Sequence, residues 1–147
     1  MTFKESVRTV LKEKYLTIEG RAPRSEYWWF FLFYVLVNFA IGPVDRILFG
    51  ANEFGPIGTL FGVLMVIPFI TAGARRLHDR DMSAWWMLLL VIPLIGSIAL
   101  IILYVLPGTN GPNRFGADPL GNDSNGPNDE DGDIGLSQSS IPRVDRE

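Results

Sequence analysis

Residues 75–81, with the sequence RRLHDRD, hold side chains of the kind from which catalytic sites are built. Six of these seven residues are ionisable, and His78 is the only histidine in the chain. Histidine transfers protons near neutral pH, and Asp79 follows it directly. A serine nucleophile would have to be Ser83, and a metal would need more ligands than one histidine and no cysteine can supply. We therefore predict no catalytic residue, no metal and no cofactor at this stretch.

A structural interpretation of the same stretch rests on its neighbours. Trp85-Trp86 follows it, and Trp28-Trp29 follows a second charged stretch within GRAPRSEYWWFF at 20–31. Tryptophan prefers the membrane–water boundary because its ring is apolar while its N–H needs a polar partner. The two pairs predict that both charged stretches lie at a membrane surface.

Charged side chains at that depth are costly unless they are paired. The spacing favours a Glu26–Arg75 or an Arg24–Asp79 ion pair, with the remaining positive charge attracting anionic lipid headgroups. The predicted interfacial motif comprises Gly20, Arg21, Arg24, Glu26, Trp28, Trp29, Arg75, Arg76, His78, Asp79, Trp85, Trp86, Asn113, Arg114, Phe115 and Gly116.

The members of this motif near the C-terminus belong to PGTNGPNRFGADP at 107–119, which is dense in turn-forming residues. We expect Arg114 and Phe115 to anchor the outer end of the preceding apolar helix. The alternative is a solvated turn that only ends this helix.

Three apolar segments must position these residues. Spans of about 27–48, 54–74 and 84–106 are each long enough to cross a hydrocarbon core, which takes about 20 helical residues. The first span either ends near Pro43 or continues with Asp45 and Arg46 at the far boundary. The third contains Pro93 and Gly96, and we expect one kinked helix, because a hairpin would leave about ten residues per arm, too few to cross.

The N-terminal segment, residues 1–26, predicts an amphipathic helix and a linker. Its apolar residues share one helical face, and Lys4, Arg8 and Lys12 form a row beside them. This pattern is typical of a helix lying in the membrane interface and ending at Gly20. A core helix of a small cytosolic bundle is the competing interpretation.

Charge divides the chain unevenly. Residues 1–106 carry ten Lys/Arg and eight Asp/Glu, whereas 107–147 carry three Arg and eight acids. We predict a turn segment at 107–120 and a disordered acidic tail at 121–147. The fold class is therefore an all-α integral membrane protein with three transmembrane helices, a preceding interfacial helix and a disordered tail.

Orientation follows from the distribution of Lys and Arg. The N-terminal segment has six such residues and the loop between the second and third spans has three, whereas the first connection has only Arg46. Basic segments stay in the cytoplasm. We expect a multi-pass protein with its N-terminus in the cytoplasm and its C-terminus outside.

The stretches GRAPRSEYWWFF, RRLHDRDMSAWW and PGTNGPNRFGADP, in this order, resemble the bacterial inner-membrane family catalogued as domain of unknown function 805. The resemblance covers about residues 15–120 and implies a small integral protein of the bacterial cytoplasmic membrane, without implying an activity. After Asp79 the family usually has a small or glycine-containing turn, whereas this chain has Arg80-Asp81-Met82. The tail beyond Asn122 matches nothing in the family pattern.

Three functions remain open at this point. The first is a non-enzymatic accessory, scaffold or lipid-interacting protein, with anionic headgroups, further copies or other membrane proteins as partners; Gly58-x-x-x-Gly62 would permit close helix packing. The second is a transporter or channel subunit, acting as an oligomer. The third is a membrane enzyme using the His78 loop. Nucleic-acid binding has no support, because the membrane surface already accounts for the basic residues.

Overall fold

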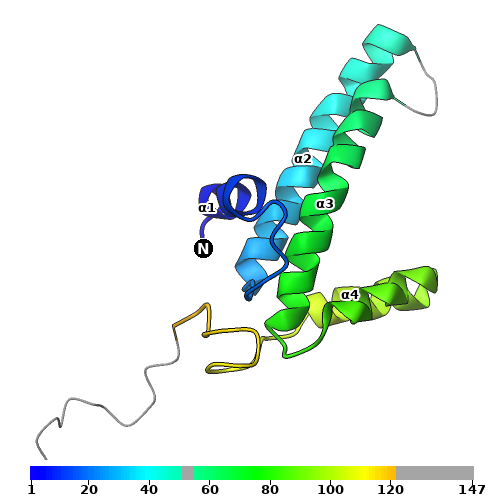
Figure 1. The fold of residues 1–147 in the computed structure, drawn as a ribbon. Helices are drawn as coiled ribbons and strands as arrows, with labels where there is room; N and C mark the ends of the chain where they lie inside the picture. Colours follow the sequence, from blue (N-terminus) through cyan, green and yellow to red (C-terminus); the bar gives the residue numbers. More distant parts are fainter. Residues whose placement is uncertain (51–54, 122–147) are drawn as a thin grey trace, which may run out of the picture.

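The computed structural model describes residues 1–50 and 55–121, and every regular element within these ranges is helical (Figure 1). This confirms the all-α class. Of the predicted tail at 121–147, residues 122–147 lie outside the described residues. The elements are α1 (Phe3–Arg8), the π-helical η1 (Thr9–Glu13), α2 (Arg24–Phe49), α3 (Pro56–His78), the 3-10 helix η2 (Ala84–Val91) and α4 (Ile95–Val105).

The long helices α2 and α3 lie side by side as a hairpin (Figure 1). Helix α2 continues through Pro43 to Phe49, so of the two alternatives for the first span the continuous helix is correct. The most apolar windows of α2 and α3 have mean hydropathies of 1.6 and 2.0, yet only 6% and 28% of these windows are buried within the protein. A helix from a soluble core would bury most of such residues, so the outward apolar side chains indicate a membrane environment.

Asp45 joins the far ends of the two long helices. Its carboxylate accepts hydrogen bonds from the backbone N–H groups of Ile57 (3.0 Å) and Gly58 (2.8 Å) and so caps the start of α3. Gly58 and Gly62 face α2 of the same chain, since a Cβ at these positions would lie 3.2 Å from Asp45 Oδ2 and 3.9 Å from the Tyr34 hydroxyl. The glycine pattern therefore serves packing within the hairpin.

Helix α1 and η1 pack against the side of this hairpin (Figure 1). Val10 is fully buried with Phe30 of α2 and Ala72 of α3. At the start of α1, Thr2 and Glu5 form a capping box, and the hydrogen bond from the Thr2 N–H lowers the pKa of Glu5.

The prediction that the N-terminal helix ends at Gly20 is wrong. The helix ends at Glu13, and Lys14 already has non-helical angles (φ −130°, ψ 33°). Pro68 has no N–H, so the carbonyl of Leu64 one turn earlier has no helical partner. The Tyr15 hydroxyl donates to this carbonyl over 2.7 Å. This bond fixes the linker after η1 against the middle of α3.

The third apolar segment differs most from expectation. Residues 84–106 form two short helices, η2 and α4, which fold back on each other and run away from the long hairpin (Figure 1). Leu94 reverses the chain with φ +64°, and Gly96 packs so closely that a Cβ would lie 1.6 Å from the Leu89 carbonyl oxygen. The prediction of one kinked helix is therefore wrong. The length argument assumed that the segment must cross the membrane, whereas short apolar helices also form re-entrant or interfacial structures.

Candidate functional site

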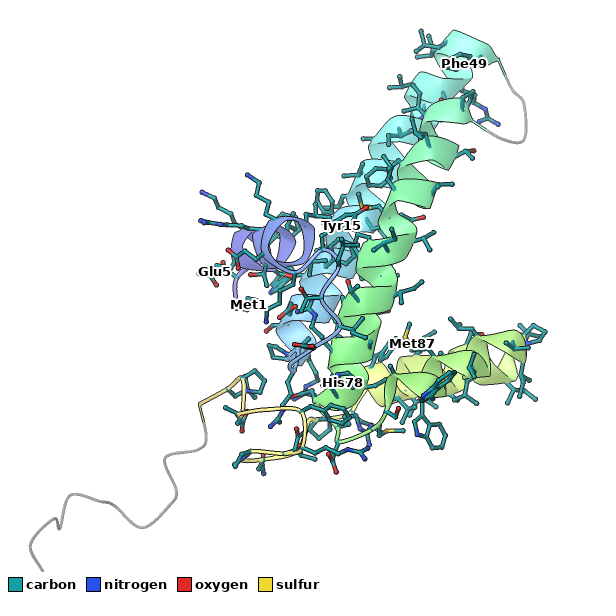
Figure 2. All side chains as sticks on the ribbon, viewed as in Figure 1. Met1, Glu5, Tyr15, Phe49, His78 and Met87 are labelled. Atoms are coloured by element: carbon teal, nitrogen blue, oxygen red, sulfur yellow. The ribbon has the colours of Figure 1, made fainter. Side chains whose placement is uncertain are left out.

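The residues of the predicted interfacial motif meet at the end of the long hairpin that lies far from Phe49, where α3 ends at His78 (Figure 2). Most of the charged side chains here are buried, an arrangement that proteins adopt only when the charges are paired or hydrogen-bonded. We call this group the arginine cluster; it consists of Arg21, Arg24, Glu26, Arg75, Arg76, Asp79 and Arg80.

Arginines satisfy the last carbonyl groups of α4. A helix leaves four C-terminal carbonyls without partners. Arg80 Nη1 donates to the Leu103 oxygen (3.3 Å), Arg76 Nε to the Tyr104 oxygen (3.1 Å) and Arg24 Nη1 to the Val105 oxygen (3.2 Å). Arg76 Nη2 also donates to the oxygen of Leu106. The two predicted charged stretches thus converge on one helix end, with favourable positive charge at its negative dipole end.

Asp79 joins two of the arginines. It pairs with Arg76 from the same helix end and with Arg21 Nε at 3.0 Å. The predicted Arg24–Asp79 pair is therefore wrong, because Arg21 takes the place expected for Arg24. Gly108 packs directly on this carboxylate, since a Cβ there would lie 2.0 Å from Asp79 Oδ2.

Glu26 and Arg75 form the second ion pair of the cluster, with both side chains at most 1% exposed. This pair was one of the two predicted from the sequence and is confirmed. The Ser6 hydroxyl donates to the Glu26 carbonyl, and Ala22 N–H donates to the Arg75 carbonyl over 3.0 Å. Nε and Nη2 of Arg75 have no hydrogen-bond partner among the described residues.

Arg21 fastens the turn segment to the cluster. Its Nη1 and Nη2 each donate over 2.6 Å, to the carbonyl oxygens of Gly111 and Thr109 respectively. The Thr109 N–H donates to the Asp79 carbonyl over 2.8 Å. Residues 107–118 therefore lie at the same end of the hairpin as Arg21. The third apolar segment turns back at Leu94, so the chain leaves this segment at the same end of the hairpin at which it enters it.

His78 contacts this turn segment and makes no hydrogen bond with Asp79 among the described residues. Its ring stacks on Phe115 with centroids 3.9 Å apart, and its Nδ1 lies 3.3 Å from the Gly20 carbonyl oxygen. Asn113 Nδ2 donates to the His78 carbonyl over 2.9 Å. The backbone of Asn113 forms a tight turn with that of Gly116 through two hydrogen bonds of 3.0 Å. The stack and the turn hold the side chain of the single histidine in place.

The anchor predicted for Arg114 and Phe115 at the outer end of the third span is wrong. Arg114 Nε forms an ion pair with Asp81 at 3.1 Å, and Arg114 Cζ lies 4.8 Å from the centroid of the Phe115 ring. Both residues therefore lie beside His78, at the end of α3. They close the loop that follows α3.

The two tryptophan pairs border the cluster. Trp28 Nε1 donates to the Tyr104 carbonyl over 3.3 Å, and Trp29 meets Phe3 of α1 edge-on with centroids 5.9 Å apart. Trp85 and Trp86 begin η2 and are 76% and 49% exposed. Both pairs thus belong to segments that start from the same end of the long hairpin.

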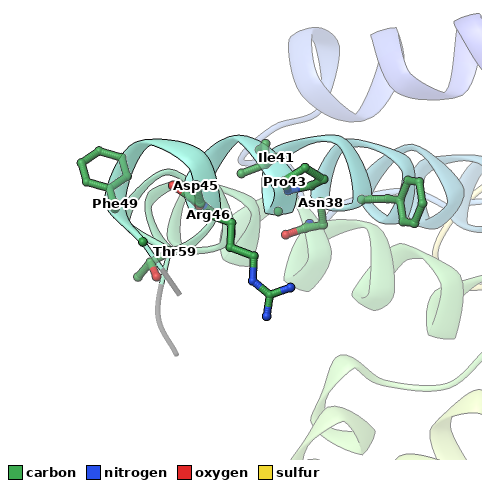
Figure 3. A pocket seen from close by; sticks show the side chains of 12 residues that line it. Asn38, Ile41, Pro43, Asp45, Arg46, Phe49 and Thr59 are labelled. Carbon is green, nitrogen blue, oxygen red and sulfur yellow. The ribbon is translucent and has the colours of Figure 1, made fainter. Parts of the chain in front are cut away.

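At the other end, a groove of about 730 Å³ lies between the last turns of α2 and the start of α3 (Figure 3). Arg46 extends into it on the side of Asn38 and forms no ion pair within residues 1–50 and 55–121. Asn38 donates to the Tyr34 carbonyl over 3.0 Å. This groove brings together few groups that could bind or react.

Sequence reasoning missed the residues whose carbonyls bind the arginines. Arg24, Arg76 and Arg80 bind carbonyls of residues 103–106 at the end of α4. Arg21 binds those of Thr109 and Gly111. Backbone acceptors carry no sequence signal. Within the described part of the chain, no three His, Asp or Glu side chains gather as a metal site would require.

Comparison with known proteins shows the family to which the chain belongs. The family model described as "Protein of unknown function (DUF805)" matches residues 15–117, which contain every segment of the arginine cluster. The chain belongs to this family. Two relatives in Escherichia coli K12 are both named inner membrane proteins. YhaH is 44% identical over 112 residues, and YhaI is 38% identical over 111 residues.

These matches cover 75% and 76% of this chain and 92% of each relative. No solved structure matches. The DUF805 match and the apolar helices α2 and α3 together identify a membrane protein whose relatives are located in the inner membrane. The matched region ends within the turn segment, at residue 117, so the predicted acidic tail lies beyond it.

Proposed function

We propose that this DUF805 protein is a non-enzymatic, two-pass protein of the bacterial inner membrane that presents a rigid basic surface to anionic lipids of the cytoplasmic leaflet. The observation that carries this proposal is the arginine cluster. Its buried arginines bind carboxylates and helix-end carbonyls, an arrangement that stabilises the fold. The exposed basic residues nearby remain available to the membrane surface.

The two-pass topology rests on the hydrogen bonds of Arg21 to Thr109 and Gly111. Segments joined by such bonds lie on one side of a bilayer, so α2 and α3 cross it and η2 and α4 turn back. Ten of the eleven Lys and Arg of residues 1–121 then lie on one side, with Arg46 alone near the other. By the positive-inside rule that side is the cytoplasm.

The surface that would meet lipid is formed by α1 and η1. Lys4, Arg8 and Lys12 are exposed, while Ser6 and Val10 on the opposite face are buried against α2 and α3. A helix held with its basic side chains outward near headgroups attracts anionic lipid by about 1 kcal/mol per basic residue. The accessory role then consists of ordering such lipids, or membrane proteins that bind them, around the hairpin.

Fluorescence quenching tests this proposal directly. All four tryptophans of the chain lie in segments that start from the end of the long hairpin where the arginine cluster lies, so their emission reports on lipids at this end. In vesicles, we expect brominated phosphatidylglycerol to quench the full chain more strongly than brominated phosphatidylcholine. The triple variant Lys4→Gln/Arg8→Gln/Lys12→Gln should lose most of this difference, whereas Arg46→Gln should keep it. Equal quenching by both lipids in the unsubstituted chain would overturn the proposal.

A further inference from the structure

A cleft of about 590 Å³ separates the long hairpin from the η2–α4 pair. It exists because the arginine cluster holds α4 at its C-terminal end while the rest of η2 and α4 runs away from α2 and α3 (Figure 1). Its volume falls within the range of sites that hold small molecules. The two short helices therefore form one wall of a built cavity.

The walls of the cleft are apolar. Phe31 of α2, Val66 and Ile70 of α3 and Leu100 and Ile101 of α4 contribute to it. Water is poorly held by such walls because it finds few hydrogen-bond partners. In a membrane, the apolar material available to fill the cleft is a hydrocarbon chain.

The mouth of the cleft carries positive charge. Trp28 lines the cleft and also a neighbouring hollow of about 470 Å³, which Arg24 and Ser25 line as well. The side chain of Arg24 is exposed, and within the described part of the chain only one of its five N–H donors, on Nη1, has a hydrogen-bond partner, the Val105 carbonyl. A phosphate placed here would therefore find free donors one helical turn from the cleft.

We propose that the cleft binds an acyl chain of an anionic glycerophospholipid whose phosphate is held by Arg24. This inference rests on the proposed function and names the lipid class and its position. The order of features along the site matches that of the lipid. The charged group lies at Arg24, the ring of Trp28 lies at the depth where tryptophan prefers the interface, and the apolar walls lie beyond it.

Photolabelling of the full chain in nanodiscs tests this site. The probe is phosphatidylglycerol with a diazirine near the end of one acyl chain, and a phosphatidylcholine with the same chain is the reference. We expect labelled peptides to contain Val66, Ile70, Leu100 or Ile101, with about fivefold more labelling by the phosphatidylglycerol probe. Equal labelling by the two probes, or labelling spread evenly over α2 and α3, would overturn the proposal.

Variants separate the acyl-chain site from the headgroup site. Ile101→Trp should fill the cleft and reduce its labelling several-fold, whereas Ile98→Trp, one turn earlier and outside the cleft, should not. Val66→Phe fills the cleft from α3 and serves if Ile101→Trp does not fold. Arg24→Gln should remove the preference for phosphatidylglycerol and leave the acyl chain in place. Equal labelling of the filling variants and Ile98→Trp would contradict the site.

One further outcome would identify another occupant, and one further variant separates the cleft from the basic surface of α1 and η1. If the filling variants dissociate a dimer and lipid labelling is absent, the cleft holds a second copy of the chain and the proposal is wrong. The triple variant Lys4→Gln/Arg8→Gln/Lys12→Gln should keep the labelled cleft while losing its general preference for anionic lipid. If this variant loses the preference for anionic lipid while the cleft is still labelled, the basic surface of α1 and η1 and the cleft act independently. Failure of the proposed surface can then be told apart from failure of the cleft site.

Discussion

Arg76 Nε donates a hydrogen bond of 3.1 Å to the carbonyl oxygen of Tyr104, 28 residues later in the chain. This bond ties the end of α3 to the end of α4. Arg76 belongs to the charged stretch for which a catalytic role was considered. In the structure its side chain binds a carbonyl group at the C-terminal end of α4.

Arg76→Met should reduce the free energy of unfolding by about 3–5 kcal/mol, the range found when one member of a buried ion pair is removed. The change leaves Asp79 with Arg21 alone, leaves the Tyr104 carbonyl with Trp28 alone and removes the hydrogen bond to the Leu106 carbonyl. Hydrogen exchange should accelerate in the last turn of α4. Arg80→Met is the matched control, because it removes one hydrogen bond of a half-buried side chain and should lower the stability by about 1 kcal/mol.

Glu26 and Arg75 should be coupled in a double-mutant cycle. Glu26→Leu and Arg75→Met each leave a buried charge without its partner, so each should be strongly destabilising. The double variant removes both charges, and its loss should be smaller than the sum of the single losses by about 1–3 kcal/mol. Unfolding in SDS titrations would measure this difference, and additive losses would count against the pair.

Gly96→Ala distinguishes the folded-back segment from a single kinked helix. In the structure the added Cβ would lie 1.6 Å from the Leu89 carbonyl oxygen, so η2 and α4 would have to separate. We expect a loss of about 1–3 kcal/mol. Gly42→Ala in α2, where a Cβ meets nothing within 4 Å, should be neutral or stabilising. In a single helix both substitutions would behave like the control.

Asp45→Ala should loosen the start of α3. The carboxylate accepts two backbone N–H bonds there, and losing a cap of this kind costs about 1 kcal/mol. Exchange at the Ile57 and Gly58 amides should accelerate while exchange near Arg75 stays unchanged. Arg46→Ala, at the adjacent residue, removes a charge without removing the cap and should leave these amides unaffected.

The parts of the fold that sequence could predict are those governed by local pattern. The apolar lengths of α2 and α3 follow from composition, and the Glu26–Arg75 pair follows from placing two opposite charges at the same end of neighbouring helices. Burial of these charges had to be compensated, so pairing was the physical expectation.

The remaining features depend on tertiary structure. Whether residues 84–106 cross or turn back depends on the backbone at Leu94 and on the contact between Gly96 and Leu89, and neither is visible in hydropathy. The choice of Arg21 over Arg24 as partner of Asp79 depends on where the linker before α2 runs. The backbone carbonyls that bind Arg24, Arg76 and Arg80 become acceptors at this place only because α4 ends here.

We propose that the arginine cluster gathers residues 20–26, 75–81 and 103–118 on the cytoplasmic side, so that the chain crosses the membrane twice. The chain contains no cysteine, so single cysteines can be placed at Leu16, at Glu53 between α2 and α3, and at Leu120. We would measure their reaction with a membrane-impermeant maleimide in intact and in lysed spheroplasts. The two-pass topology predicts that Glu53→Cys reacts in intact spheroplasts, while Leu16→Cys and Leu120→Cys react only after lysis. Reaction of Leu120→Cys in intact spheroplasts, with Leu16→Cys still protected, would contradict it.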